Sequence, residues 1–462
     1  MALAALPGTM PGMLFPPFRA PWRARSLALA TVAALAACAA APVPPPATPP
    51  STPAPSPTPP STPLSTPLLD VSHPPRGPAA EPADLAGRFQ SWLSAFRAQA
   101  RAAGIDEATL QAAFSDVRHL PRVIELDRTQ PEFTRSVWDY LDTAVSPQRV
   151  ARGRERLAQV QAEADAAAAR YGVPAAVIGA IWGIESNFGG DLGQTPVIDA
   201  LATLGFDGRR EAWAREQLLA ALKILQSGDI ERQRLVGSWA GAMGHTQFIP
   251  SAFLAYAVDA DGDGRRDLWS SMADVTASTA NFLARSGWQP GQPWGLEVRL
   301  PPGFDPARAD DTLRQGAARW ADEGLRTADG AALPELPDAS VFLPAGARGP
   351  AFLVGPNFRT ILRYNNSTSY ALAVGLLAQR LAGGPGVQAA WPRELQPLSR
   401  SQTVALQAAL NERGFDSGPA DGLIGPATRA AVRRWQRSEG LPADGYPTLE
   451  LLQRVLAAAM PQ

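Results

Sequence analysis

One carboxyl group stands where acid–base chemistry would suit it. Glu185 follows Ile181 and Trp182 by four and three residues, so on a helix it continues their apolar stripe. Burial disfavours a carboxylate, as does the negative end of a helix dipole, so we expect the pKa of Glu185 to lie above its ordinary value. A carboxyl group that stays protonated near neutral pH can serve as a general acid. The spacing fits equally well a glutamate that caps the helix or pairs with an arginine.

A second group of carboxylates lies in an acidic turn further along the chain. Oxygen ligands at positions 1, 3 and 5, a glycine at 6 and a carbonyl at 7 are typical of EF-hand calcium loops. Asp259, Asp261 and Asp263 supply the first three ligands, and the Arg265 carbonyl stands at position 7. Position 12 is Ser270, so the usual bidentate glutamate is missing. The turn therefore predicts a structural Ca²⁺ site, with a metal-free solvated loop as the alternative.

Length and composition limit what could carry these groups. A chain of 462 residues is too long for one compact core and suits two or three domains. Hydrophobic residues make up 45% and charged residues 18%, which is typical of globular structure. Lys and Arg number 42 against 43 Asp and Glu, whereas nucleic-acid binders usually carry a basic excess. We expect no nucleic-acid partner.

The first 84 residues are typical of an exported, anchored protein. Arginines precede an apolar run at 26–37 that is too short to span a bilayer, so 1–37 is predicted to be a signal peptide. Its end, LAAC at 35–38, resembles a lipobox, which implies lipidation of Cys38 and anchoring to the periplasmic side of the bacterial outer membrane. The alternative is ordinary cleavage with Cys38 incidental. Residues 38–84 are rich in Pro, Ser and Thr and are predicted to form a disordered tether.

Helical periodicity dominates the remainder of the chain. We expect a mainly α (α+β) body over 85–384, a linker at 385–397 and a small module over 398–457. The Glu185 helix should stop at the glycine pair 189–190. Helices are predicted from Phe89 onward, from an Asp106 N-cap to Phe114, and at 148–171, 174–187, 211–227, 272–286 and 368–382; short strands are predicted at 296–300, 340–343 and 352–354.

Several motifs in the body together resemble the membrane-bound lytic transglycosylase B family. They are QPEF (130–133) ahead of WDY (138–140), WGIESNFG (182–189), GAMGHTQFIPS (241–251) and YNNSTSY (364–370). Their order and separation match over about 85–384. The resemblance implies a lysozyme-like helical catalytic domain that cleaves the glycan strands of peptidoglycan.

The resemblance also implies a reaction and assigns Glu185 to it. The family uses one carboxylic acid to protonate the oxygen between N-acetylmuramic acid and N-acetylglucosamine. The conjugate base then takes the proton of the muramic C6 hydroxyl, which attacks C1 and closes a 1,6-anhydro ring. Substrate N-acetyl assistance would replace the second carboxylate that most glycosidases need. No organic cofactor is implied.

Further residues are assigned by their match to the family motifs. Ser238 and Gln247 would bind the sugar's N-acetyl group or Glu185, and the longer family calcium loop would be closed by Asp274. The other predicted substrate contacts are Tyr140, Arg209, Arg210, Tyr364, Asn365 and Tyr370. For the tyrosines the alternative is ordinary packing, and for Ser238 it is a solvated position without function.

Residues 398–457 resemble a three-helix peptidoglycan-binding domain. The match rests on Leu406-Gln407, the Asp-Gly pairs at 421–422 and 444–445, and Trp435-Gln436. Its glycines and Asp421 are expected to form turns. Two rival functions remain for the whole chain, a hydrolytic muramidase and a non-enzymatic murein scaffold; the second should lack the set Glu185, Ser238, Gln247 and Asn365, which is present.

Overall fold

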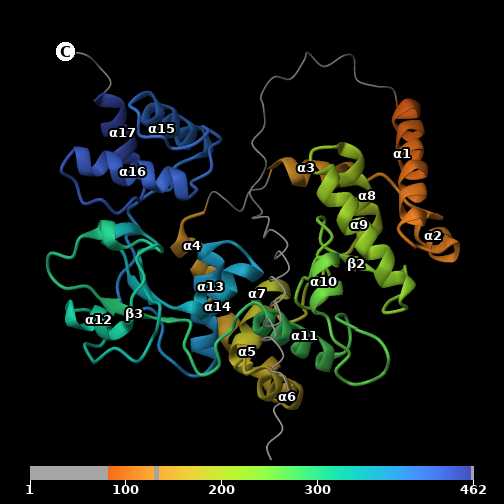
Figure 1. Cartoon of the computed structure of the whole chain (residues 1–462), viewed down its shortest axis with the longest axis horizontal. Helices are drawn as coiled ribbons and strands as arrows, with labels where there is room; N and C mark the ends of the chain where they lie inside the picture. The colour runs from red at the N-terminus through yellow and green to blue at the C-terminus, as the bar shows by residue number, and fades with distance from the viewer. Residues whose placement is uncertain (1–81, 130–134, 459–462) are drawn as a thin grey trace, which may run out of the picture. The chain divides into compact units, whose positions relative to one another are not determined.

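The computed structural model describes residues 82–129 and 135–458 (Figure 1). The predicted signal peptide, Cys38, most of the tether and the QPEF motif lie outside these residues. The first four helices are α1 (Pro82–Ala102), α2 (Glu107–Phe114), α3 (Pro121–Thr129) and α4 (Val137–Ala144). As predicted, Asp106 caps α2: its side chain accepts a hydrogen bond of 2.7 Å from the Thr109 amide.

Helices that surround one buried helix form the centre of the body. α7 (Ala175–Ser186) packs against α5, α6, α11 and α14 (Figure 1). Most of its side chains are buried, so this helix is held from nearly all sides. The helices between and around them are α5 (Pro147–Gln159), α6 (Gln161–Tyr171), α8 (Val197–Asp207), α9 (Glu211–Gln226), α10 (Pro250–Tyr256), α11 (Met272–Arg285), α13 (Pro356–Tyr364) and α14 (Thr368–Leu381).

The predicted β element is a small antiparallel sheet with its own core. Its strands stand in the order β4-β3-β6-β5, so two pairs of consecutive strands are joined through β3 and β6, which are not consecutive in sequence. Trp320 is fully buried beneath it and donates its indole N–H to the Ala339 carbonyl at 3.0 Å. The elements are β3 (Gly295–Arg299), η2 (Pro306–Arg308), α12 (Ala317–Asp322), β4 (Arg326–Thr327), β5 (Ser340–Phe342), η3 (Gly346–Arg348) and β6 (Ala351–Val354); β1 (Thr195–Pro196) and β2 (Val236–Gly237) pair elsewhere.

One predicted helix is divided in two, and one predicted stop signal is wrong. The helix expected over 148–171 breaks at Val160, whose side chain turns into a cluster with Trp182 and Phe188. The Glu185 helix ends at Ser186, before the glycine pair, because Asn187 and Phe188 adopt left-handed φ values of 52° and 59°. The Phe188 ring can fold back under the helix since residues 153 and 183 are glycines; a Cβ there would lie 2.5 and 2.4 Å from its Cζ atom.

The C-terminal module has three helices and a separate hydrophobic core. α15 (Arg400–Glu412), α16 (Pro426–Ser438) and α17 (Leu449–Ala457) enclose Leu406, Trp435 and Val455. The mainly α fold with a small β element and a helical module is thus confirmed. The segment predicted as a linker is anchored to the body: the Arg393 guanidinium donates to both Asp142 oxygens at 2.7 and 2.9 Å.

Across the described residues, no single helix has the length and apolar character to cross a membrane. Only α6 and α7 together meet that criterion, and they are bent by 117° between them.

Candidate active site

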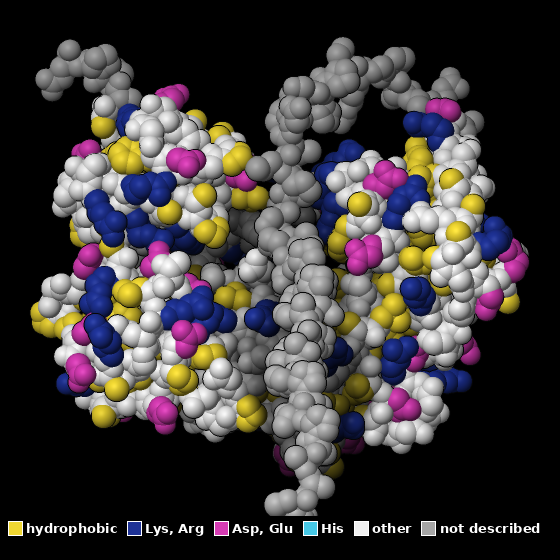
Figure 2. Space-filling model, viewed as in Figure 1, with side chains coloured by type: hydrophobic (Ala, Val, Ile, Leu, Met, Phe, Trp, Pro, Cys, Tyr) yellow, Lys and Arg dark blue, Asp and Glu magenta, His cyan; other side chains and the backbone are white. Residues whose placement is uncertain are grey.

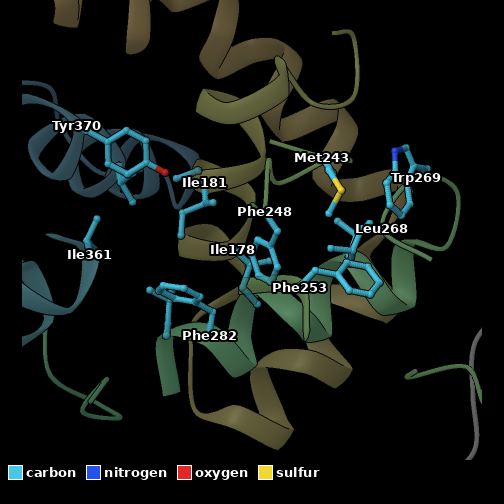
Figure 3. Packing of buried hydrophobic residues seen from close by; sticks show 14 of the residues in the cluster. Ile178, Ile181, Met243, Phe248, Phe253, Leu268, Trp269, Phe282, Ile361 and Tyr370 are labelled. Atoms are coloured by element: carbon cyan, nitrogen blue, oxygen red, sulfur yellow. The ribbon is translucent and has the colours of Figure 1, made fainter. Parts of the chain in front are cut away.

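Glu185 meets Tyr370 at the junction of α7 and α14. The Tyr370 hydroxyl donates a hydrogen bond of 2.5 Å to Oε1 of Glu185. Tyr370 is 4% exposed and lies beside Ile181 in the core, with its hydroxyl pointing from α14 toward α7 (Figure 3). Because one carboxyl oxygen is engaged by a fixed donor, the proton of a neutral Glu185 belongs on the other oxygen, Oε2.

The pKa of Glu185 is raised to about 7, as the apolar stripe predicted. Burial is the larger cause, since it penalises the carboxylate, and the Tyr370 hydrogen bond opposes it. The nearest acidic residue in sequence, Asp191, uses its carboxylate to accept the Gly193 amide at 3.0 Å. Glu185 can therefore hold or release a proton near neutral pH without help from a second carboxylate.

Two more predicted tyrosines lie near this carboxyl group. Burial first, and then the charge of Glu185, raise the pKa of Tyr140 to about 12 and that of Tyr364 well above its ordinary value. Tyr364 donates its hydroxyl to the Thr246 carbonyl at 2.5 Å and stacks on Tyr370 with ring planes 8° apart. All three phenols stay neutral at physiological pH, so they can only donate or accept hydrogen bonds.

Ser238 and Gln247 lie on the hairpin that carries the GAMG turn. The Ser238 hydroxyl oxygen accepts the amides of Ala240 and Ala242, at 3.3 and 3.1 Å. Gln247 has a left-handed φ of 50°, and its side-chain amide donates to the Gly244 and Leu192 carbonyls at 2.9 and 3.2 Å. Ser238 is left as a donor and the Gln247 carbonyl oxygen as an acceptor.

The predicted arginine pair is held by a buried aspartate. Arg209 forms a bidentate pair with Asp127, with both N···O distances 2.5 Å, and Arg210 approaches the same carboxylate at 3.3 Å. Asp127 is 2% exposed, so it needs these cations to offset its burial. Asn365 is exposed at the end of α13, and no hydrogen bond among the described residues joins it to Glu185.

The acidic loop brings three of its predicted ligands together. Carboxylate oxygens of Asp259, Asp261 and Asp263 lie within 4.8 Å of one another, and all three residues are exposed. Asp274 is not part of this cluster. It is fully buried, and its two oxygens accept the amides of Ala260 and Asp267 at 2.7 Å each, which closes the loop at its base.

Sequence reasoning missed a cation beside the Glu185 helix. Arg149 on α5 donates to the Gly183 carbonyl at 2.7 Å, in the last turn of α7. A positive charge there compensates for the negative end of the helix dipole. Arg149 also lowers the pKa of Tyr140, against the larger effect of burial. No motif or periodicity marks an arginine whose partner is a backbone carbonyl 34 residues away.

A helical body that presents one buried carboxyl group among phenols, with a pKa near neutral pH, suits an enzyme that uses acid–base chemistry. The transglycosylase SLT domain family matches residues 88–379, and a peptidoglycan-binding domain matches residues 399–455. The chain therefore belongs to the transglycosylase SLT family.

The chain is similar to three characterised members of this class of protein. Membrane-bound lytic murein transglycosylase B of Escherichia coli is 32% identical over 300 residues, which cover 60% of this chain and 79% of that one. SltB3 from Pseudomonas aeruginosa, solved in complex with NAG-anhNAM-pentapeptide, is 54% identical with a TM-score of 0.77, and the match covers 80% of this chain and 99% of SltB3. The lytic transglycosylase Slt35 of E. coli, solved in complex with calcium, is 31% identical with a TM-score of 0.54 over 64% of this chain and 92% of its own.

Proposed function

We propose that this chain is a lytic murein transglycosylase in which Glu185 acts first as general acid and then as general base. It would cleave the β-1,4 bond from N-acetylmuramic acid to N-acetylglucosamine and leave a 1,6-anhydro end. The observation that carries the proposal is the hydrogen bond from Tyr370 to a carboxyl group whose pKa is about 7. The ligand in the SltB3 complex, which carries an anhydro sugar by its name, supports the reaction type.

One carboxyl group is sufficient for both proton transfers of this reaction. Protonated Oε2 of Glu185 gives its proton to the glycosidic oxygen, and the bond from C1 to that oxygen breaks. The carboxylate that results keeps the Tyr370 hydrogen bond, which stabilises the charge. The C6 hydroxyl of the muramic sugar then forms the new bond to C1 and returns its proton to Glu185. No water is consumed, so the products together have the mass of the substrate.

The hairpin supplies complementary partners for an N-acetyl group. Ser238 has its acceptor capacity used by two backbone amides, so it would donate to the acetyl carbonyl. Gln247 has its amide hydrogens used by two carbonyls, so it would accept the acetyl N–H. Held in this way, the acetyl oxygen can assist at C1 in place of a second carboxylate. Tyr140, Tyr364, Asn365, Arg209 and Arg210 are proposed to line the remaining substrate path.

Product analysis tests this reaction against the hydrolytic rival. Purified sacculi are digested with the wild-type chain, with Glu185→Gln and with Glu216→Gln, a control at an exposed glutamate on α9. We expect the wild type and the control to release fragments whose masses show anhydro ends. The amount of fragments released by Glu185→Gln should be lower than that of the wild type by about a thousandfold or more. Fragments that gain the mass of water, or full activity of Glu185→Gln, would contradict the proposal.

We also propose that the acidic loop binds Ca²⁺. Three exposed carboxylates that converge within 4.8 Å are oxygen ligands of the kind this ion prefers, and the Arg265 carbonyl is a candidate fourth. The calcium complex of Slt35 supports the choice of ion. Asp274 would hold the loop closed at its base and leave coordination to the other residues. Bound ion would neutralise the acidic cluster and stabilise the loop.

Calorimetry decides the calcium proposal without reference to catalysis. Adding Ca²⁺ to the chelator-treated chain should release or absorb heat and raise Tm, and Asp261→Asn should weaken both effects. Asp322→Asn, a change at an exposed aspartate on α12, is the matched control and should respond as the wild type does. An unchanged Tm with no heat of binding in the wild type would exclude a specific site.

Attachment to membrane and wall would involve both ends of the chain. We propose that Cys38 is lipidated and tethers the enzyme to the periplasmic face of the outer membrane, which the membrane-bound E. coli relative supports. Cys38→Ser should move the chain from the membrane fraction to the soluble fraction. The C-terminal module would hold murein: arginine side chains gather on it (Figure 2), and the exposed Arg434 and Arg437 of α16 suit carboxylates of the polymer.

A further inference from the structure

A histidine in the GAMG hairpin joins the end of the Glu185 helix to the segment that follows the acidic loop. Nδ1 of His245 accepts the indole N–H of Trp182 at 2.8 Å. Its Nε2 lies 3.2 Å from the Trp269 carbonyl oxygen. Trp182 is 4% exposed and Trp269 is 8% exposed, so the bridge connects two buried tryptophans.

The two contacts define the state of the ring. A nitrogen that accepts an indole N–H carries no proton, so Nδ1 of His245 is bare. The Trp269 carbonyl can only accept, so Nε2 carries the hydrogen. His245 is therefore a neutral imidazole with its proton on Nε2, and both ring nitrogens are used.

The main chain of His245 holds the same turn of the helix. Its carbonyl accepts the Ser186 hydroxyl at 2.6 Å, and its amide donates to the Leu268 carbonyl at 2.8 Å. Trp182 and Ser186 lie four residues apart on one face of α7, and Glu185 stands between them. Both flanking residues are thus bound to His245, which fixes how far the last turn can rotate or unwind.

The neighbouring backbone is shaped to let the ring approach. Gly189 has a φ of 78°, and a Cβ there would lie 2.4 Å from Cε1 of His245. Gly244 has a φ of 69°, and its Cβ would lie 2.5 Å from the Leu268 carbonyl oxygen. Both glycines are therefore required for the close contact between hairpin, helix end and segment 268–269.

We propose that His245 is a positioning residue for the reaction: it clamps the last turn of α7 so that Glu185 is held against Tyr370. The inference rests on the proposed role of Glu185 and adds a residue that acts through it. The indole bond holds one side of the turn, while Tyr370 receives the carboxyl group on the other. Loss of the clamp would let the turn loosen and admit water to Glu185.

The surroundings keep the imidazole neutral in the working range. Burial is the main cause that lowers the pKa of His245, and the charge of Arg156 adds to it. The Trp269 carbonyl and the charge of Asp267 act in the opposite direction. Neutrality matters because a protonated Nδ1 could not accept the Trp182 hydrogen.

Two near-isosteric variants separate the two ends of the bridge. In His245→Asn the side-chain oxygen can replace Nδ1 as acceptor, and in His245→Gln the side-chain amide can replace Nε2 as donor. We expect His245→Ala and His245→Gln to lower kcat by about 10- to 100-fold with little change in KM, because a misplaced catalytic group loses rate more than binding. His245→Asn should retain most of kcat.

The pH profile gives a readout that a purely structural role would not move. Activity needs protonated Glu185, so it falls as pH rises through the pKa of that group, and this limb should move to lower pH in His245→Ala as water reaches the carboxyl group. His119→Ala removes another partly buried histidine, packed edge-on against Phe89 and Phe206, and serves as the matched control. Its kcat and pH limb should match the wild type in the folded chain.

A spectroscopic signal tests the clamp independently of catalysis. In the full chain labelled with ¹⁵N-tryptophan, the indole resonance that disappears in Trp182→Phe should shift in His245→Ala and His245→Gln and stay in place in His245→Asn. An unshifted resonance in His245→Ala, or an unmoved pH limb, would overturn the clamp. Full activity of Glu185→Gln would instead overturn the proposed function, and the indole resonance would still decide whether the clamp exists.

Discussion

The catalytic centre and the C-terminal module use buried polar side chains in opposite ways. In the module, Gln407 is 1% exposed and is fully engaged: its carbonyl oxygen accepts the Gly422 amide at 2.8 Å, and its amide donates to Asp421 at 3.0 Å and to Thr428 at 3.1 Å. Asp421 also accepts the Leu423 amide at 2.8 Å. Asp421 thus forms a turn, as predicted.

The module repeats this arrangement one helix later. The Gln436 carbonyl oxygen accepts the Gly445 amide at 2.8 Å, and its amide donates to Asp444 at 2.7 Å, which in turn accepts the Tyr446 amide at 2.9 Å. Two glutamines on successive helices therefore each hold an Asp-Gly turn against the core. In both, the side-chain amide and the side-chain carbonyl oxygen are each engaged by the fold.

The catalytic centre keeps part of its capacity unused. Only Oε1 of Glu185 is bound by a described side chain, Ser238 retains a donor, and the buried Thr246 hydroxyl has no hydrogen-bond partner among the described residues. Leaving buried polar groups unpaired costs stability, and a ligand that pairs with these groups would offset that cost. The contrast shows why composition alone cannot tell a binding site from a turn.

Among the substitutions that test this comparison, Glu185→Gln should have the largest effect on activity. It should reduce lytic activity by about a thousandfold or more, because the acid and base are removed together. It should also raise Tm by a few degrees at pH 8. The folded-state pKa of Glu185, about 7, lies above its ordinary value of 4.5, so native-state stability falls as pH rises from 4.5 to about 7, and at pH 8 the full cost of the buried carboxylate is present.

Differential scanning calorimetry across pH checks the stability part of this prediction. The advantage of Glu185→Gln over the wild type should shrink as pH falls from 8 to 5, where the carboxyl group is neutral in the folded chain. Glu216→Gln, at an exposed glutamate, should show no such trend. A variant that loses stability at every pH would mean that Glu185 contributes to the fold as the module's glutamines do.

Tyr370→Phe should have the next largest effect. The Tyr370 hydrogen bond lowers the pKa of Glu185, so removing it raises that pKa and moves the alkaline limb of kcat/KM to higher pH. The rate should fall about tenfold, since the carboxylate that forms during the reaction is no longer stabilised by this hydrogen bond. Tyr171→Phe, at the C-terminal end of α6 where Arg170 lies over its ring, is the control. A limb that moves to lower pH would contradict the assigned role of the phenol.

The sequence predicted the residues of the site better than it predicted the local backbone geometry around them. Helical spacing placed Glu185 on a buried face but fitted a capping or ion-paired glutamate equally well, and the family motifs assigned its catalytic role. The glycine pair was wrongly predicted to stop its helix, because the left-handed conformation of Asn187 and Phe188 depends on packing under Gly153 and Gly183. That packing joins residues from two helices, which no local propensity encodes.

Contacts between distant segments explain the other gaps. Arg149 finds its partner in the Gly183 carbonyl, and His245 finds its partners in Trp182 and Trp269. Motif matching placed Asp274 among the calcium ligands, which stays a prediction, and the tertiary fold adds two backbone amides at the base of the loop as its partners. Residue type predicted the kind of group in each case, while the partner was set by the tertiary fold.

The smallest effects are expected from substitutions of the module's glutamines. These substitutions test whether buried polar side chains in the module serve the fold and not the binding of ligand. Gln407→Ala leaves the Gly422 amide without its partner and removes one of the hydrogen bonds that Asp421 accepts, and should lower the module's stability by about 2 kcal/mol. Gln436→Ala should cost less because Gln407 also donates to the Leu423 carbonyl at 3.0 Å and to the Thr428 hydroxyl.

Thermal unfolding and two activity assays test this prediction together. Gln453→Ala, at an exposed position on α17, is the control and should leave Tm unchanged. Both glutamine variants should retain wild-type turnover of soluble glycan fragments but sediment less with sacculi as the module unfolds. If Gln407→Ala lost sacculus binding with its melting transition intact, this glutamine would contact the polymer, and the distinction between side chains that hold the fold and side chains that bind ligand would fail at that position.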